Sequence, residues 1–364
     1  MSRWAERLGR RRSLHQFLTG ATAGDAITNQ ALIMRDWLHD LGFHSNLYAQ
    51  HIHESMQDEV QPLTAYRRSR GETQAIYHHS IGSEVASFLQ QHGPRLILVH
   101  HNVTPAHFFT HVNPAWARRA RLGGEQLRVL CPHVELALAD SAFNELELVD
   151  AGYKTTGVLP IVLDTEQYNL PDNDSLTRQL QEMVGPILLF VGRLAPNKKQ
   201  EDLVKLLYCY RRFCPSAHLF LVGDRWDMGH DGWVERLAHN LGLADAVTLT
   251  GKVSQQDMVT YYRHADLYVS MSEHEGFGKP LVESMYLGLP ILAYAATSVP
   301  YTLGAAGVKF HKKKFEHLAE LVDILIEDDA LRARIVTAQR QKVQEYLEPQ
   351  VRRQFIGFLE QAQS

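Results

Sequence analysis

The sequence is poor in cysteine and contains no long apolar run. Its 364 residues include only three cysteines, Cys131, Cys209 and Cys214, whose spacing matches no metal-ligand pattern. Cys209 and Cys214 fall in an expected helix and at its end, so buried thiols are expected there rather than a disulfide. No segment approaches the roughly 18 apolar residues of a membrane-spanning helix. The sequence therefore argues against a disulfide scaffold, a cysteine-based metal site and an integral membrane protein.

The chain also lacks a strong excess of either charge. The sequence has 37 Lys and Arg residues against 41 Asp and Glu, a formal net charge of −4. This balance gives no overall attraction to nucleic acid, which is therefore not an expected partner. The segment from Met1 to Arg12 is rich in arginine but leads into no apolar core, so it does not read as a secretory signal. We expect a cytoplasmic protein.

Short apolar runs alternate with amphipathic segments along the whole chain. This alternation predicts an α/β protein with parallel sheets that helices cover on both faces. The expected strands are 13–18, 45–49, 74–77, 95–100, 136–141, 187–192, 218–223, 247–251, 267–272 and 291–295. The expected helices are 25–41, 82–91, 142–152, 200–213, 232–241, 255–264, 280–287, 315–327, 330–346 and 351–361.

A polar segment at 163–175 separates the two halves and reads as a linker. We therefore expect two doubly wound, Rossmann-like parallel-sheet domains that face each other across a cleft. Ligands in such domains bind at the carboxyl ends of the strands. The expected domains are 1–162 and 163–345, and 346–364 is expected to form a helix that crosses back to the first domain.

The most informative segment is EGFGKPLVE, from Glu275 to Glu283, in which two carboxylates flank a glycine turn and the start of a helix. Pro280 suits the first turn of that helix. The preceding turn aims backbone N–H groups at the space beyond the helix end, where the helix dipole favours an anion. Gly276 and Gly278 lack the Cβ atoms that would keep a phosphate away. The pair can bracket a phosphate and accept hydrogen bonds from hydroxyls on either side, as a nucleotide sugar requires. The alternative is an ordinary loop-to-helix junction with two solvated glutamates.

Two cations follow the first strand of the second half. Gly192 ends that strand, and Arg193 and Lys198 come next, at the ligand rim of the sheet. Their charges suit phosphate oxygens and would neutralise a departing diphosphate. Further strand-end turns at Gly223 and before Val253 offer backbone groups for a nucleobase. The alternative interpretation is that Arg193 and Lys198 are solvated loop residues and that the strand-end turns bind no ligand.

Together these motifs resemble the donor domain of the retaining glycosyltransferases of family 4, the glycosyl transferases group 1, which have the GT-B fold. The resemblance rests on Gly192-Arg193 with Lys198, Val222-Gly223-Asp224, Gly251-Lys252-Val253 and Ser272 through Glu283. In the first half, Gly24-Asp25-Ala26 resembles the N-terminal glycine loop of the family. Residues 140–144 resemble its segment that closes the first domain.

The resemblance implies a hexosyltransferase that uses a nucleotide sugar, such as a UDP- or GDP-hexose, and needs no further cofactor and no metal. Arg193 and Lys198 would contact the donor diphosphate. Glu275 would bind the transferred sugar, and Glu283 would accept hydrogen bonds from the ribose. His101 falls where related enzymes keep a histidine near the reacting sugar. The other implied donor-binding residues are Gly24, Gly192, Gly223, Val253, Gly276, Phe277 and Gly278.

Other interpretations remain open at this point. Lys279 stands where relatives usually have an apolar residue, which leaves the donor sugar unspecified. A nucleotide-sugar 2-epimerase of the same architecture and a non-catalytic sugar-nucleotide-binding subunit are the alternative functions. The acceptor is expected to be a saccharide or a lipid-linked saccharide. The basic segment 116–121 suggests peripheral contact with the inner face of a membrane. Histidine doublets at 78–79 and 100–101 do not predict a metal site, because neighbouring strand residues point to opposite faces.

Overall fold

The computed structural model describes residues 13–68, 72–225 and 229–363, so the arginine-rich segment before Ser13 lies outside the described residues. The chain forms two compact units. The first unit comprises the described residues up to Thr110, together with Pro114–Val162 and the residues from Pro349 onward. The second unit comprises His111–Asn113 and Leu163–Glu348.

The first unit is built on a seven-stranded sheet with the order β3-β2-β1-β4-β5-β6-β7. Every neighbouring pair in it is parallel. The strands are β1 Gln16–Ala21, β2 Leu47–Ile52, β3 Val60–Pro62, β4 Gln74–His79, β5 Arg95–His100, β6 Val134–Ala139 and β7 Thr156–Val158. The helices of this unit are α1 Ala26–Asp40, α2 Glu84–His92, α3 Pro114–Leu130, α4 Ala142–Asp150 and α13 Glu348–Gln363.

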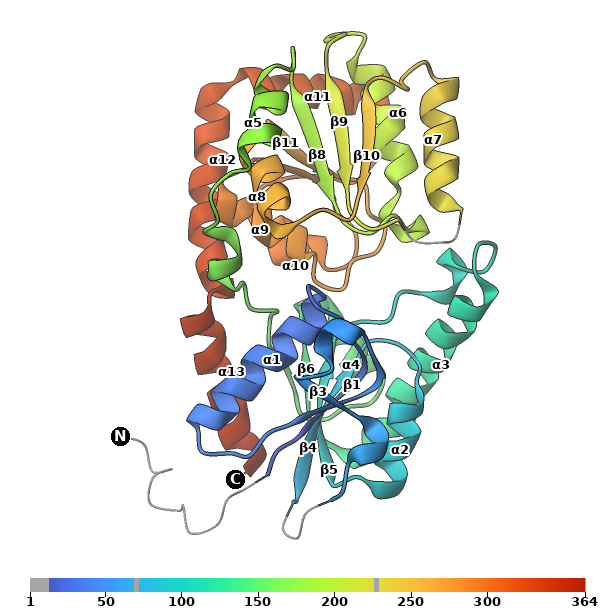
Figure 1. Ribbon diagram of the computed structural model, residues 1–364, viewed down its shortest axis with the longest axis vertical. Coiled ribbons are helices and arrows are strands. Elements are labelled where there is room, and N and C mark those ends of the chain that lie inside the picture. The colour runs from blue at the N-terminus through green and yellow to red at the C-terminus, as the bar shows by residue number, and fades with distance from the viewer. Residues whose placement is uncertain (1–12, 69–71, 226–228, 364) are drawn as a thin grey trace. The chain divides into compact units, whose positions relative to one another are not determined.

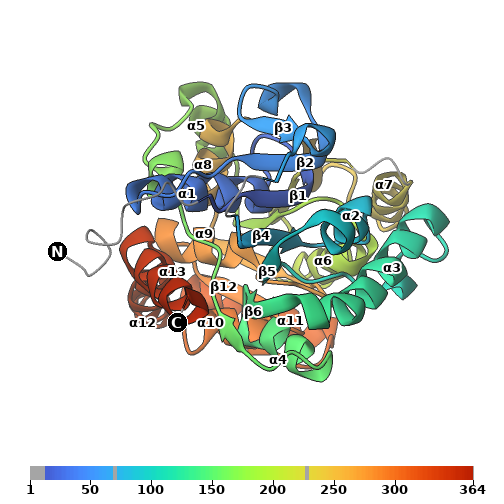
Figure 2. The same cartoon turned by 90° about the horizontal axis from the view of Figure 1, so that it is seen from below.

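Helices cover both faces of this sheet, as the alternating pattern predicts. Side chains from α2, α3 and α4 pack with β4 and β5 in one apolar cluster. Side chains from α1 and α13 pack in another cluster, in which the rings of Trp37 and Phe355 lie 5.7 Å apart. Figure 2 shows α1 and α2 flanking the strands β1 and β2. The last helix of the chain therefore belongs to the core of the first unit.

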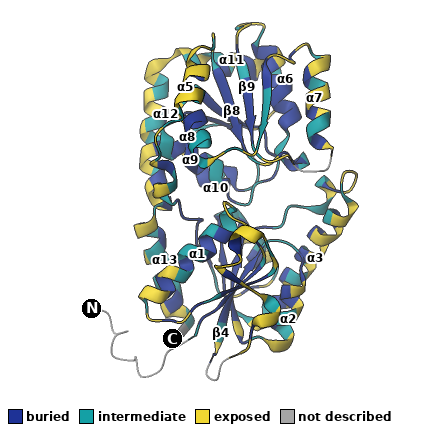
Figure 3. Ribbon diagram, viewed as in Figure 1, coloured by how far each residue is buried: buried dark blue, intermediate teal, exposed yellow. Residues whose placement is uncertain are grey.

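The second unit is built on a six-stranded parallel sheet with the order β10-β9-β8-β11-β12-β13. Its strands are β8 Ile187–Val191, β9 His218–Val222, β10 Val247–Gly251, β11 Leu267–Ser270, β12 Ile291–Tyr294 and β13 Val308–Phe310. Its helices are α5 Asp174–Gln181, α6 Gln200–Tyr210, α7 His230–Asn240, α8 Gln255–His264, α9 Lys279–Leu287, α10 Val299–Leu303, α11 Phe315–Glu327 and α12 Asp329–Lys342. Figure 1 shows β8, β9 and β10 side by side with α6 and α7 next to them. In Figure 3 the strands β8 and β9 are mainly buried, whereas α12 exposes one side to solvent.

Short 3-10 helices join these elements in the part of the chain that the structure describes. They are η2 Glu54–Met56, η3 Leu63–Ala65, η4 Ala106–Phe108, η5 Cys131–His133, η6 Thr165–Tyr168, η7 Pro196–Lys198 and η8 Val343–Tyr346. The two sheets confirm the prediction of two Rossmann-like parallel-sheet domains.

Several elements were not expected from the sequence. The edge strands β3, β7 and β13 have three residues each, too few to show a period. Helix α3 contains Gly123 and Gly124, which weaken a helical pattern. Gly123 is required there because a Cβ atom would lie 2.7 Å from the backbone nitrogen of Gly82. Of the three free cysteines, only Cys209 is buried, so Cys214 differs from the expectation.

Candidate functional site

The strand order of the second unit places its predicted site residues at one point of the sheet. The order reverses direction between β8 and β11, which are neighbours although they are far apart in sequence. Ligands of open α/β sheets bind outside the carboxyl ends of the strands at such a reversal. Arg193 and Lys198 follow β8, and Glu275 follows β11. The topology therefore brings together two motifs separated by about eighty residues of sequence.

Lys198 and Glu275 form a direct ion pair. The Lys198 Nζ lies 2.6 Å from Oε2 of Glu275, and the two side chains are 21% and 11% exposed. A charge-assisted contact of this length in a partly desolvated place is stronger than a surface pair. Both groups still reach solvent, so a ligand can approach them. The pair fixes the position of the cation before any ligand binds.

Backbone contacts hold the two loops against each other. The backbone N–H of Glu273 donates to the carbonyl of Asn197 at 2.8 Å. The Asn197 side-chain amide donates to the carbonyl of His274 at 3.0 Å, in a buried position. Thr297, which has a positive φ of 46°, accepts a hydrogen bond from the N–H of Glu275 at 2.8 Å. These hydrogen bonds therefore hold the loops that carry Lys198 and Glu275 in position.

Gly278 and Phe277 define the glycine turn before α9. Gly278 is the N-cap residue of α9 with a φ of 84°, a left-handed conformation that a side chain would strain. A Cβ atom there would also lie 2.9 Å from Cδ1 of Leu281. Phe277 is 5% exposed, and its ring packs against Tyr346 at 5.4 Å. The side chain of Phe277 therefore anchors the turn, which leaves only its backbone for a ligand.

Glu283 lies one turn inside α9 and is almost completely buried, at 3% exposure. The Tyr168 hydroxyl donates to its Oε1 at 2.6 Å, and the Tyr262 hydroxyl donates to its Oε2 at 2.7 Å. The Lys279 ammonium lies 3.6 Å from Oε1. Both carboxylate oxygens thus have protein donors, which the sequence did not suggest.

The remaining predicted residues of the second unit lie in strand-end turns of the same sheet. The N–H of Gly192 donates to the carbonyl of Val222, and the N–H of Gly223 donates to that of Gly251. A Cβ atom at Gly223 would lie 2.2 Å from the carbonyl oxygen of Gly192, so close packing of two turns requires this glycine. Arg193 is exposed, and Val253 is half-buried in the loop between β10 and α8.

A network of charged side chains borders the Lys198–Glu275 pair. The Lys313 ammonium lies 2.9 Å from Oδ2 of Asp202 and 2.8 Å from Oε1 of Glu273. Burial opposes the charge on Asp202, but hydrogen bonds from Lys205 and Lys313 hold the pKa of its carboxyl below the ordinary value. This network ties α6 and the loop before α11 to the loop that carries Glu275.

Gly24 and His101 belong to the first unit. Gly24 is exposed in the turn between β1 and α1, with a φ of 83° and open space where a Cβ atom would be. Asp25 caps α1 by accepting a hydrogen bond from the N–H of Thr28 at 3.0 Å. Gly24 therefore lies in the turn that starts α1, in a left-handed conformation that favours glycine.

His101 is part of a buried hydrogen-bonded chain. Its side chain is 1% exposed, and its Nδ1 lies 2.9 Å from Oδ2 of Asp140. Its Nε2 lies 2.9 Å from Nδ1 of His78, whose Nε2 lies 2.8 Å from Oε1 of Gln16. Both ring nitrogens of His101 thus have protein partners. Its assignment as a catalytic residue stays a prediction.

A second histidine pair lies beside the first. The Nδ1 atoms of His79 and His100 are 3.2 Å apart, and the two rings stack at 5.4 Å. Burial, followed by the neighbouring imidazole, holds the pKa values of His78 and His79 well below the ordinary value. Both side chains are therefore neutral in the folded protein at pH 7.

These two histidines predict a loss of stability in acid. Below a pH of about 6.5, His78 and His79 become protonated in the unfolded chain but stay neutral in the folded chain. The free energy of unfolding therefore falls as the pH falls. Each fully protected histidine contributes up to about 1.4 kcal/mol per pH unit. Urea unfolding at pH 7.0, 6.0 and 5.0 measures this slope, and the variant His79→Gln should have a smaller one. Equal stability at all three values would contradict the account.

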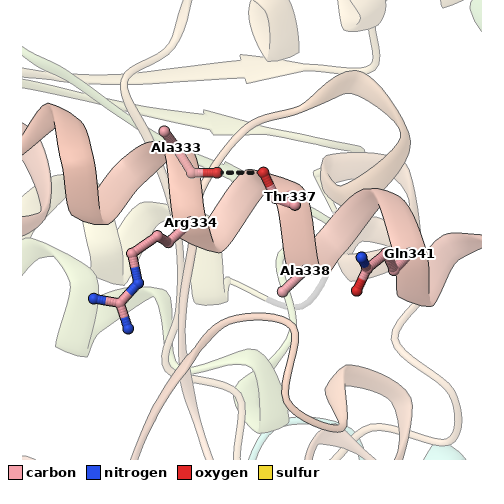
Figure 4. A pocket seen from close by; sticks show the side chains of 5 residues that line it. All are labelled: Ala333, Arg334, Thr337, Ala338 and Gln341. Atoms are coloured by element: carbon pink, nitrogen blue, oxygen red, sulfur yellow. Dashed lines mark hydrogen bonds between the residues drawn. The ribbon is translucent and has the colours of Figure 1, made fainter.

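Clusters of metal-ligating side chains and membrane-spanning helices are both absent from the described residues. In the segments 13–68, 72–225 and 229–363, no group of three or more His, Cys, Asp or Glu side chains is arranged to hold a metal ion. Within the same segments, no helix combines the length and apolar character needed to cross a membrane. A surface depression of about 420 Å³ lies along α12 and contains none of the predicted site residues (Figure 4).

Sequence reasoning missed several residues that shape the site. Asn197 joins the two loops, and Tyr168 and Tyr262 bind Glu283. His78 was noticed only as part of a doublet, and its contact with His101 depends on the register of β4 against β5. No local motif marks the two tyrosines, since they come from η6 and α8. Their role becomes visible only when these elements are packed together.

Residues 174–342 match a family described as "Glycosyl transferases group 1". Among curated proteins, the chain is 30% identical over 152 residues to mannosylfructose-phosphate synthase of Agrobacterium fabrum, covering 40% of this chain and 32% of that protein. It is 27% identical over 184 residues to a GDP-mannose-dependent alpha-(1-6)-phosphatidylinositol monomannoside mannosyltransferase of Mycobacterium tuberculosis, covering 47% of each chain. The matches thus span less than half of these two relatives.

The likeness to solved structures extends over nearly the whole chain. A crystal structure of Anabaena Alr3699/HepE in complex with UDP and glucose superposes with a TM-score of 0.74 at 19% identity. The superposition covers 96% of this chain and 100% of that one. At this identity, the likeness establishes the fold that the two chains share.

Proposed function

From the premise that this chain belongs, through residues 174–342, to group 1 of the glycosyl transferases and has the GT-B fold, we propose that the protein transfers a hexose from a nucleotide sugar to an acceptor hydroxyl. The observation that carries this proposal is the Lys198–Glu275 ion pair at the glycine turn before α9. It sets a cation, a carboxylate and the N-terminus of a helix at the carboxyl ends of β8 and β11. A nucleotide sugar offers a diphosphate and a sugar for these groups.

The chemistry of the site follows from where charge develops. Cleavage of the bond between the sugar and the phosphate builds negative charge on the leaving diphosphate. Lys198, Arg193 and the backbone N–H groups of residues 276–278 would stabilise that charge, because fixed donors in a partly dry site need little reorganisation. Glu275 holds the Lys198 ammonium in place and would accept hydrogen bonds from the transferred sugar. In this proposal these groups stabilise the diphosphate charge without a metal ion.

The stereochemical outcome is proposed to be retention. The leaving phosphate oxygen would take the proton of the acceptor hydroxyl on the same face of the sugar, so the reaction needs no carboxylate nucleophile. The family to which the chain belongs supports this assignment. The relatives named for GDP-mannose support a hexose donor.

Donor class and reaction type are tested together. We would measure thermal stabilisation by a panel of UDP- and GDP-hexoses, because a ligand that binds the folded state raises the melting temperature. Release of the nucleoside diphosphate is then measured with and without saccharide and lipid-linked saccharide acceptors. Acceptor-dependent release supports transfer. Conversion of the donor without any acceptor would indicate a 2-epimerase, and stabilisation without turnover would indicate a binding subunit.

We also propose that α3 contacts an anionic membrane surface that carries the acceptor. The exposed side of α3 presents Leu122 and Val129, which are 41% and 57% exposed. Four exposed arginines lie on the same helix: Arg118, Arg119, Arg121 and Arg128. Basic side chains beside exposed apolar ones suit the headgroups of anionic lipids.

Co-sedimentation with vesicles tests this surface. The protein should sediment with vesicles of phosphatidylserine and phosphatidylcholine at low salt, and less at high salt, because screening weakens the attraction. The variant Arg118→Glu/Arg121→Glu should stay in the supernatant. Absence of binding at low salt would end this proposal and leave the glycosyltransferase assignment untouched.

A further inference from the structure

Tyr168 joins the segment before α5 to the carboxylate of Glu283. Its hydroxyl donates to Oε1 of Glu283 at 2.6 Å, and the residue is 1% exposed. Tyr262 of α8 donates to the other carboxylate oxygen at 2.7 Å. Distances of 2.5–2.7 Å are typical of strong O–H···O⁻ hydrogen bonds. The Glu283 carboxylate is therefore held at both oxygens.

The segment that carries Tyr168 is firmly attached to the second unit. Arg263 of α8 donates to the carbonyl of Tyr168 at 2.9 Å and to that of Leu170 at 2.7 Å. Gln255 donates to the carbonyl of Gln167 at 3.0 Å. Residues 163–175, which read as a linker in the sequence, thus form part of the wall around α9.

The two phenols act as permanent donors. Burial, followed by the charge of Glu283, raises the pKa of Tyr168, and the same causes raise that of Tyr262 well above its ordinary value. Each carboxylate oxygen has two acceptor positions, of which a phenol fills one. The Lys279 ammonium, 3.6 Å from Oε1, adds a positive charge next to the carboxylate. One acceptor position per oxygen remains for the two hydroxyls of a vicinal diol.

We propose that Tyr168 is a positioning residue that orients the Glu283 carboxylate toward the ribose 2′- and 3′-hydroxyls of the donor nucleotide. This inference rests on the proposed function, which supplies the nucleotide. Tyr262 binds only one of the two carboxylate oxygens of Glu283. The phenol of Tyr168 binds the other oxygen and therefore fixes the rotation of the carboxylate about the bond that joins it to the side chain. The segment 163–175 is therefore part of the nucleotide site.

Removal of one hydroxyl tests the proposal, with a matched control on the same segment. Tyr168→Phe deletes the hydrogen bond to Glu283 and keeps the ring. Tyr286→Phe deletes a different bond to this segment, the one from Tyr286 to Oδ1 of Asn169 at 3.0 Å, and leaves the carboxylate untouched. Calorimetry measures the binding of UDP, GDP and their 2′,3′-dideoxy analogues to the wild type and both variants, whose folding is checked by thermal unfolding.

We expect Tyr168→Phe to weaken the binding of the ribonucleotide about tenfold, as for the loss of one strong hydrogen bond. Its affinity for the dideoxy analogue should equal that of the wild type, because this analogue has no ribose hydroxyls that could bind the Glu283 carboxylate. Tyr286→Phe should change neither. If Tyr168→Phe does not fold, Arg263→Ala, which releases the same segment, should give the same pattern.

Unchanged ribonucleotide binding in Tyr168→Phe, or an equal loss with the dideoxy analogue, would overturn the inference and leave the proposed function standing. A wild-type protein that binds neither UDP nor GDP would overturn the proposed function itself, and the inference with it. The two failures are therefore distinguishable in one experiment.

Discussion

The variant Lys198→Ala should lose transfer activity by a factor of about 10² to 10³ while it remains folded. Loss of one fixed donor to developing negative charge has an effect of this size in other enzymes. The loss should appear in kcat, because the ammonium interacts most strongly with the negative charge that develops on the diphosphate in the transition state. Steady-state kinetics with the donor found in the panel would measure it.

Lys205→Ala is the matched control for this variant. Lys205 lies on α6, its side chain is 40% exposed, and its ammonium binds Asp202 at 2.7 Å rather than Glu275. Its removal should change kcat less than about twofold, because a partly exposed ion pair contributes little free energy. If Lys198→Ala retained the rate of Lys205→Ala, Lys198 would not be part of the catalytic site.

The variant Asp140→Ala should lower the free energy of unfolding by about 3 kcal/mol. Loss of one partner from a buried, hydrogen-bonded pair has a cost of this size because the other group stays buried and unpaired. Asp140 and His101 have side chains that are 2% and 1% exposed, with 2.9 Å between Oδ2 and Nδ1. Urea denaturation at pH 7 measures the change.

Asp150→Ala, at the exposed end of α4, is the matched control and should change stability by less than about 0.5 kcal/mol. Equal stability of the two variants would show that Asp140 is not an essential partner of the histidine chain. The activity of Asp140→Ala also bears on His101, because a catalytic His101 would depend on Asp140 to hold its ring in place.

Elements with strong local signals could be predicted closely from the sequence. Helix α9 was expected at 280–287 and spans Lys279–Leu287, because Pro280 favours its first turn and Gly288 ends it with a φ of 76°. The strands β8, β9 and β10 begin at the predicted residues, and β8 and β9 consist almost entirely of apolar residues. The two-domain α/β architecture followed from the alternation of such runs with amphipathic helices.

The misses at the site share one cause, since each depends on contacts between elements distant in sequence. The segment 163–175 is polar and was expected to be a linker, but Asn173 caps α5 and Tyr168 enters the core of the second unit. Glu283 was predicted from its motif to bind the ribose, whereas its two phenol partners come from separate elements. The buried state of His101 likewise follows from its bonds to Asp140 and His78, not from its position at a strand end.

The account stands on a diphosphate site at the carboxyl ends of β8 and β11 in the second unit. The most direct test is a crystal structure of the protein with the nucleoside diphosphate that stabilises it most. We predict diphosphate oxygens within about 3.2 Å of the Lys198 ammonium and of the backbone N–H groups of residues 276–278. A nucleotide bound elsewhere, with Lys198 still paired only to Glu275, would contradict the account.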